Sequence, residues 1–77
     1  MKTYYEIILY KNGELWDHYD RVESYTKGVE IAKRKSLDVE YDEVALAKEV
    51  GEDGEEETTR EWTKFYKDYK LIRTEQF

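Results

Sequence analysis

The fold is decided by residues 3–19, whose sequence is TYYEIILYKNGELWDHY. Two runs rich in β-branched and aromatic residues flank Asn12-Gly13, and both of these residues tolerate the positive φ angles of a type I′ turn. The stretch therefore predicts a β-hairpin. Its expected cross-strand pairs are Tyr10 with Leu15, Leu9 with Trp16 and Ile7 with His18.

The predicted hairpin carries large apolar groups on both faces, because successive side chains of a strand point to opposite sides. One face is expected to hold Tyr5, Ile7, Leu9, Trp16 and His18, with His18 packed against Ile7. The other face is expected to hold Tyr4, Glu6, Ile8, Tyr10, Leu15, Asp17 and Tyr19. A small domain needs one core face, so the aromatic side chains on the second face of this hairpin are available for another contact.

Residues 20–36 predict a helix. Apolar residues recur there at helical spacing: Val22, Tyr25, Val29 and Ala32. Ser24 suits the N-cap position, with a capping box of Asp20 and Glu23 as the alternative. Gly28 costs about 1 kcal/mol relative to Ala inside a helix, which is tolerable where a strand packs closely against it. The basic residues 33–35 complement the negative end of the helix dipole.

Residues 43–50 predict a third strand, followed by a turn at residues 51–54. One side of this strand is expected to carry Val44, Leu46 and Val50, and the other Ala45 and Ala47. The next segment fits two structures. Residues 57–66 have the composition of a strand, whereas Thr58 and Glu61 match the capping box of a helix whose apolar residues continue to Ile72. The strand is favoured because it pairs with the third strand across a turn of hairpin length.

These elements predict a single α+β domain over residues 1–77, in the order β-β-α-β-β. It would consist of a four-stranded antiparallel sheet with one helix packed on one face; in the alternative, the last element is helical and the order is β-β-α-β-α. Residues 67–77 are expected to form a tail that folds back over the domain or is less ordered. On the sheet face without the helix, Tyr4, Tyr10 and Tyr19 would contact either a second copy of the chain or this tail.

The composition excludes several kinds of site. The chain has no cysteine, which rules out disulfides, thiolate metal sites and cysteine nucleophiles. It has one histidine and shows no nucleophile–base arrangement, phosphate-binding glycine pattern or calcium-loop order. We therefore expect a non-enzymatic protein with no catalytic residue, no cofactor and no metal. No apolar run is long enough to span a bilayer, and the N-terminus lacks a signal-peptide pattern, so we expect a cytoplasmic location, including that of a virus-infected host cell.

Negative charge is concentrated in residues 38–61, which contain eleven acidic and two basic side chains. Residues 1–37 have a net charge of +1 and residues 62–77 a net charge of +2, in a chain whose net charge is −6. Such segregation creates a directional field that steers a basic partner toward the acidic segment. The same field disfavours direct binding of nucleic acid, because it repels phosphates.

We expect this acidic segment to bind a basic protein surface. Its carboxylates would imitate the spaced charges of a phosphate backbone and occupy the nucleic-acid site of the partner. The expected contact residues are Glu49, Glu52, Asp53, Glu55, Glu56, Glu57 and Glu61. In size, acidity and lack of cysteine, the chain is similar in general character to the small inhibitors with which bacteriophages take over their hosts, among them DNA mimics. The resemblance rests on these general properties and not on a shared sequence motif.

Two other functions fit the sequence. A structural or adaptor module, or a homodimerisation domain, would use the aromatic sheet face alone. A single-stranded nucleic-acid binder would stack bases on the aromatic rings beside the basic residues of the C-terminal segment. The acidic run also has a plain explanation, because charged turns keep small domains soluble and protect them from edge-to-edge aggregation.

Overall fold

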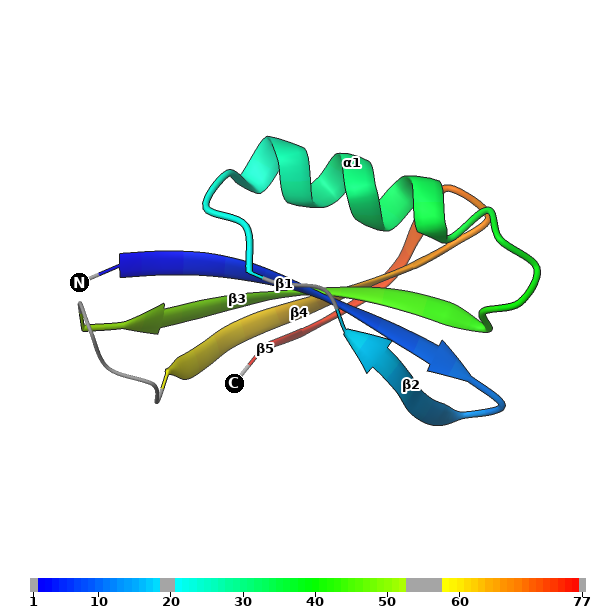
Figure 1. Ribbon diagram of the computed structural model, residues 1–77, viewed down its shortest axis with the longest axis horizontal. Helices are drawn as coiled ribbons and strands as arrows, with labels where there is room; N and C mark the ends of the chain where they lie inside the picture. The colour runs from blue at the N-terminus through cyan, green and yellow to red at the C-terminus, as the bar shows by residue number, and fades with distance from the viewer. Residues whose placement is uncertain (1, 19–20, 53–57, 77) are drawn as a thin grey trace.

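The computed structural model describes residues 2–18, 21–52 and 58–76, and these contain one helix and five strands (Figure 1). The elements are β1 (Lys2–Lys11), β2 (Glu14–His18), α1 (Tyr25–Lys35), β3 (Glu43–Gly51), β4 (Thr59–Lys67) and β5 (Lys70–Gln76). They form a single compact α+β domain in which α1 packs on one side of the sheet. The predicted fold class is confirmed at this level.

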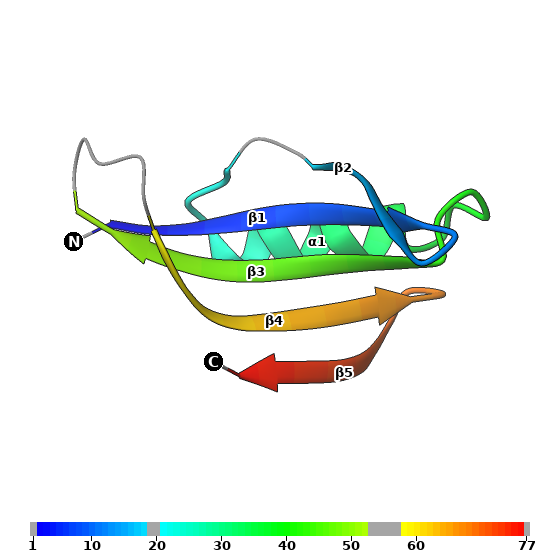
Figure 2. The same cartoon turned by 90° about the horizontal axis from the view of Figure 1, so that it is seen from below.

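All neighbouring strands pair antiparallel, in the order β2-β1-β3-β4-β5 (Figure 2). The prediction of a four-stranded sheet is wrong, because residues 70–76 form a fifth strand at the sheet edge rather than a tail that folds back. The strand predicted after the acidic turn is confirmed as β4. The helical alternative for the same segment is therefore wrong.

The fifth strand depends on a turn without glycine. Asp68 and Tyr69 join β4 to β5 with φ angles of 51° and 70°, in the left-handed region that Asn12 and Gly13 occupy in the first hairpin. This region is unfavourable for residues with a Cβ. Contacts with the end of α1 hold the turn there, since the Asp68 amide donates to the carbonyl oxygen of Ser36 (3.2 Å) and the Tyr69 amide to its Oγ (2.9 Å). A tertiary contact thus supports a hairpin that local composition does not indicate.

α1 begins later than predicted, at Tyr25 rather than at residue 20. Ser24 caps the helix by accepting a hydrogen bond from the amide three residues on (3.2 Å). Val22 is held in a β-bridge to Tyr5 by two backbone hydrogen bonds of 2.7 and 2.9 Å, which keeps it outside the helix. A Cβ on Gly28 would lie 2.9 Å from the side chain of Leu46 on β3. The glycine therefore permits a close approach of helix and strand, as expected.

The sheet carries a buried cluster on each side. The cluster beneath α1 consists of Ile7, Leu9, Ala32, Val44, Leu46 and Tyr66. The cluster on the opposite side consists of Ile8, Ala45, Ala47 and Phe65, with Tyr10 packed against it. Among the described residues, no helix covers this second side (Figure 1), which we call the open face. Pairing and alternation place on it Tyr4, Glu6, Ile8, Tyr10, Glu43, Ala45, Ala47, Glu49, Thr63, Phe65, Arg73 and Glu75.

The first hairpin contains a bulge that the sequence pattern did not indicate. The observed pairs are Tyr10 with Leu15, Leu9 with Asp17 and Ile8 with His18. Trp16 is thus the extra residue, and a shift of one residue moves the following side chains to the other face. The predicted pairs Leu9–Trp16 and Ile7–His18 are wrong. His18 does not pack against Ile7 but lies on the open face beside Glu6.

Candidate functional site

The open face has small side chains at its centre and charged side chains at both ends. Residues that lie opposite one another across the strands form rows: Tyr10 with Glu43, then Ile8 with Ala45 and Phe65, then Glu6 with Ala47 and Thr63, then Tyr4 with Glu49 and Arg60. The two alanines of β3, Ala45 and Ala47, lie at the middle of the face and are fully buried in the cluster with Ile8 and Phe65. The chemistry of the face therefore resides in the side chains at its two ends.

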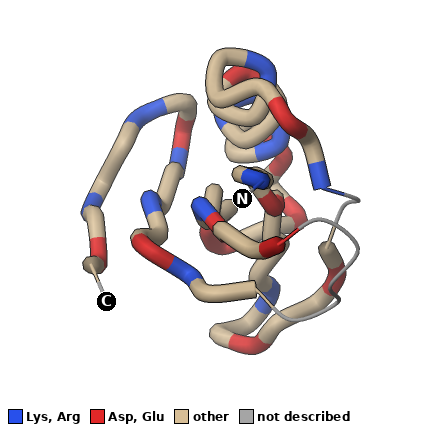
Figure 3. The backbone as a smooth tube through the Cα atoms, turned by 90° about the vertical axis from the view of Figure 1, so that its left-hand side faces the viewer, with Lys and Arg blue, Asp and Glu red and all other residues tan. Residues whose placement is uncertain are grey.

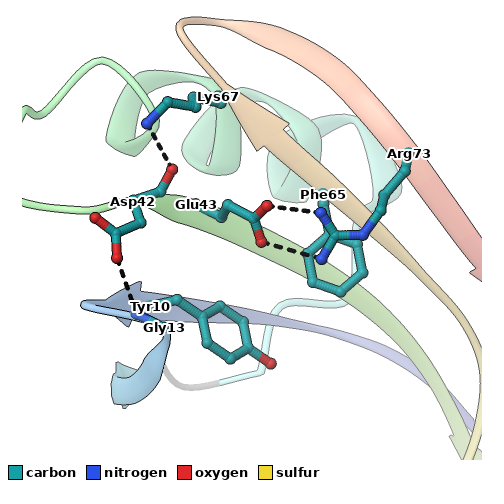
Figure 4. A pocket seen from close by; sticks show the side chains of 7 residues that line it. All are labelled: Tyr10, Gly13, Asp42, Glu43, Phe65, Lys67 and Arg73. Carbon is teal, nitrogen blue, oxygen red and sulfur yellow. Dashed lines mark hydrogen bonds and ion pairs between the residues drawn. The ribbon is translucent and has the colours of Figure 1, made fainter.

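A pocket of about 530 Å³ lies at the end where β1 finishes and β3 begins (Figure 4). Its size falls within the range of sites that bind small molecules or single side chains. It is lined by residues from four strands, from the first turn and from the position just before β3: Tyr10, Gly13, Asp42, Glu43, Phe65, Lys67 and Arg73. We call this set of residues the pocket end.

Arg73 and Glu43 form a charged wall of the pocket. The guanidinium donates two hydrogen bonds to the two carboxylate oxygens of Glu43, at 2.6 and 3.1 Å, and its Nε lies 3.4 Å from Glu75. The hydrogen bonds with Glu43 raise the pKa of Arg73 above its usual value. The guanidinium carbon also lies 3.9 Å from the ring centroid of Phe65. A bidentate and stacked guanidinium has a fixed orientation, so this wall is formed before any ligand arrives.

Aromatic rings and one lysine complete the pocket end. The rings of Tyr10 and Phe65 lie 6.2 Å apart between centroids, and Phe65 is buried while Tyr10 is half-buried. Lys67 donates a hydrogen bond to the carbonyl oxygen of Asp42 (2.9 Å), whose carboxylate accepts one from the Gly13 amide (2.9 Å). Within the described ranges, no carboxylate lies at ion-pair distance from Lys67. Its charge therefore remains open to a ligand.

Two glutamates from neighbouring strands meet at the opposite end of the open face. Glu49 is buried, with 7% of its surface exposed, and its Oε1 accepts a hydrogen bond from the Thr58 hydroxyl (2.7 Å). Glu6 has one carboxylate oxygen 3.3 Å from Nδ1 of His18 and the other 4.0 Å from the guanidinium of Arg60. We call these five residues the carboxylate end. It places two acidic groups together where water has little access.

The two glutamates have opposite pKa shifts. Burial, followed by a hydrogen bond with Glu49 and the charge of that residue, raises the pKa of Glu6 from 4.5 to about 7. Burial also acts to raise the pKa of Glu49, but hydrogen bonds from Glu6 and Thr58 and the charge of Arg60 outweigh it and lower the pKa. One member of the pair is therefore suited to remain protonated while the other is ionised.

The acidic residues predicted as a binding surface lie in different environments. Glu49 is buried on the open face, Glu61 pairs with Lys48 at 3.2 Å, and Glu52 is exposed just after β3. The remaining four, Asp53, Glu55, Glu56 and Glu57, lie outside the described residues. Among the described members of the set, Glu52 and Glu61 thus offer exposed carboxylates, and Glu49 does not.

The acidic segment as a whole is divided by β3. Four of its carboxylates, on Asp38, Glu40, Asp42 and Glu43, precede or begin the strand, whereas Glu52 follows the strand. A strand of nine residues spans about 30 Å, so the two groups lie at opposite ends of the sheet. Figure 3 shows acidic and basic stretches interspersed over the described backbone. The charge that is contiguous in the sequence does not form one contiguous array in the part that the structure describes.

Two of the three predicted aromatic contact residues lie on the open face. Tyr4 and Tyr10 are both half-buried there, and the guanidinium of Arg21 lies 5.4 Å from the ring centroid of Tyr4. Tyr19 lies outside the described residues. Tyr4 lies opposite Glu49 at one end of the face, whereas Tyr10 lies at the other end.

Sequence reasoning missed three residues that give the open face its chemistry: Glu6, Phe65 and Arg73. Glu6 stands between Tyr5 and Ile7 in an apolar strand, and a carboxylate in such a strand is a signal for a buried charge. Arg73 and Glu43 are thirty residues apart, and no local pattern connects them. Their contact follows from the fifth strand, which the sequence did not predict.

Two further features are absent from the described residues. They contain no group of three or more histidine or acidic side chains placed to hold a metal ion. In the same part of the chain, no helix is both long and apolar enough to cross a membrane. No model of a known protein family matches the chain, and no curated protein or solved structure is significantly similar to it. The open face is therefore the basis for assigning a function.

Proposed function

We propose that the protein is a non-enzymatic protein-binding module that receives its partner on the open face. An apolar or aromatic side chain of the partner enters the pocket end, between the Tyr10 and Phe65 rings and the Arg73–Glu43 wall. The pocket of about 530 Å³ is the observation that carries this proposal. The few residues that contribute most of the free energy of protein association are often aromatic residues and arginines, and they pack in such pockets.

The charged groups of the pocket end suit recognition better than catalysis. Arg73 and Glu43 are engaged with each other through two hydrogen bonds, so neither is poised as an acid or a base. Because this pair is already neutralised, an apolar group can enter beside it without leaving a charge unpaired. Lys67 adds a positive charge at the rim, which favours a partner segment with an acidic residue next to its anchor.

Selection of random peptides displayed on phage tests the proposal. We expect the selected peptides to share an aromatic residue with a neighbouring acidic residue. Their affinity should fall at least tenfold for Tyr10→Ala and several-fold for Lys67→Ala, as anchors and rim charges do in other interfaces. Thr26→Ala, on the exposed surface of α1 across the sheet, is the matched control and should bind as the parent does. Peptides that bind Tyr10→Ala as tightly as the parent would contradict the proposal.

A second candidate function is the inhibitor that places carboxylates in the basic nucleic-acid site of a partner. The net charge of −6 and the exposed Glu52 and Glu61 favour it. Here the test is salt dependence, because association steered by charge weakens as ionic strength rises. Glu52→Lys with Glu61→Lys should abolish capture of a basic nucleic-acid-binding protein and leave peptide binding at the pocket end unchanged. If the parent and this double variant capture such a protein equally at low and at high salt, the inhibitor hypothesis fails.

A further inference from the structure

The carboxylate end contains an oxygen atom without a hydrogen-bond donor. Oε1 of Glu49 is satisfied by Thr58, whereas Oε2 is buried and has no partner among the described residues. The carboxyl of Glu6 has suitable chemistry to supply the missing donor, because it interacts with the carboxyl of Glu49 through a side-chain hydrogen bond. Two carboxyl groups form such a bond only when one of them carries a proton, because two carboxylates are both acceptors.

We propose that the carboxyl groups of Glu6 and Glu49 share a single proton in weakly acidic solution and that this proton links β1 to β3. Glu6 holds the proton and donates it to Oε2 of Glu49. The proton therefore has a structural role, since it satisfies a buried carboxylate oxygen that nothing else in the described structure reaches. The Glu6–Glu49 pair shares no residue with the pocket end and needs no partner.

The groups around the pair determine which glutamate holds the proton. Arg60 on β4 lies directly opposite Glu49 in the sheet, and Arg21, from the segment before α1, also acts on Glu49 through its charge. Together with the hydroxyl of Thr58, these groups stabilise an ionised Glu49.

Glu6 is subject to opposing influences. His18 on β2 and the more distant Arg60 favour its ionised form, since their charges lower its pKa. Burial and the neighbouring charge of Glu49 outweigh them, so the pKa of Glu6 rises to about 7. The arrangement resembles other pairs of carboxyl groups that are held so close together that both cannot ionise.

Loss of the proton weakens the fold. A carboxyl whose pKa is higher in the folded than in the unfolded chain stabilises the fold below its unfolded pKa, and this contribution disappears as the pH rises through the folded value. For Glu6 the window runs from about 4.5 to about 7. Glu49, with a lowered pKa, has the opposite dependence and loses its contribution on the acid side. Stability should therefore be greatest in weakly acidic solution and fall toward pH 8.

Carbon-13 NMR of the carboxyl carbons, recorded from pH 4 to pH 9, tests the proposal. The expected result is one glutamate, Glu6, that titrates near pH 7 in the parent, while no such step remains in Glu6→Gln. His18→Gln removes the single histidine of the chain and should keep the carboxyl step, which separates it from titration of the imidazole. In Glu49→Gln the midpoint of Glu6 should move toward 4.5. The proposal is overturned if every glutamate in the parent titrates below about pH 5.5, or if the step survives in Glu6→Gln.

Urea unfolding supplies a second readout on the same variants. Between pH 5 and pH 8, the unfolding constant of the parent should rise by about tenfold or more relative to that of Glu6→Gln, whose amide donates a hydrogen bond at every pH. Equal pH dependence in the parent and Glu6→Gln, both shown to be folded by circular dichroism, would also overturn the proposal.

Discussion

The two ends of the open face bury acidic side chains by different means. At the pocket end, the carboxylate of Glu43 faces the guanidinium of Arg73, and the opposite charges neutralise each other. At the carboxylate end, Glu6 faces Glu49, and the two acidic groups can lie together because one of them is protonated and uncharged. The first arrangement keeps a polar wall of paired opposite charges ready for a ligand. The second responds to pH and ties the central strands together.

The difference follows from exposure. The side chains of Glu43 and Arg73 remain 27% and 45% exposed, so water still solvates the pair. Glu49 is 7% exposed, and a buried charge of this kind needs a hydrogen-bond donor for each oxygen. Removal of the carboxylate should therefore have a large effect on the free energy of unfolding at the carboxylate end and a small effect at the pocket end.

The largest effect is expected from Glu49→Ala, compared with Glu43→Ala as its matched control. Glu49→Ala leaves the Thr58 hydroxyl and Glu6 without their partner and should lower the free energy of unfolding at pH 6 by about 2–3 kcal/mol. Glu43→Ala removes one member of a half-exposed ion pair and should lower it by about 1 kcal/mol or less. Chemical denaturation measures both values. Equal losses would show that the two ends do not differ in the way described.

An intermediate effect is expected from Glu6→Gln at alkaline pH. The pKa of Glu6 is raised, so the parent loses stability as the pH rises through about 7, whereas the amide cannot ionise. After allowance for the partial exposure of the site, Glu6→Gln should exceed the parent by about 1–2 kcal/mol in free energy of unfolding at pH 8 and match it near pH 5. Thermal or urea unfolding at the two pH values measures this. A variant that is less stable than the parent at pH 8 would contradict the account of the carboxylate end.

The smallest effect is expected from salt, and its sign should differ between the two ends. At pH 8, added sodium chloride screens the repulsion between Glu6 and Glu49 and should narrow the gap between the parent and Glu6→Gln. Added salt also screens the attraction between Arg73 and Glu43. It should therefore lower the stability of the parent toward that of Arg73→Gln, whereas at the carboxylate end it should raise the stability of the parent toward that of Glu6→Gln. Unfolding in 0.05 and 0.5 M salt provides the comparison. Shifts of the same sign in both pairs would be inconsistent with it.

The two hairpins show how far the sequence could predict the fold. Asn12 and Gly13 accept positive φ by themselves, so the first hairpin was visible as a local pattern. Asp68 and Tyr69 adopt the same backbone region because Ser36, more than thirty residues away, accepts two hydrogen bonds from their amides. A turn held by a tertiary contact leaves no local signal, and the fifth strand was missed with it.

The candidate site was predicted in part, for a similar reason. Tyr4 and Tyr10 were placed on a sheet face free of the helix because alternation along β1 is regular. The bulge at Trp16 reversed the orientation of His18, and a single inserted residue of this kind has no sequence signature here. The Arg73–Glu43 pair required β5, so the pocket end became visible only in three dimensions.

Chemical-shift mapping tests the role of the pocket end most directly. Nitrogen-15-labelled protein is titrated with a selected aromatic peptide, and the amide shifts of the parent are followed. The largest shifts are predicted at the end of β1, the start of β3 and the end of β4, around Tyr10, Glu43 and Phe65, and they should vanish with Tyr10→Ala. Largest shifts on α1 or at Glu52, or an unchanged pattern in Tyr10→Ala, would contradict the assignment of binding to the pocket end.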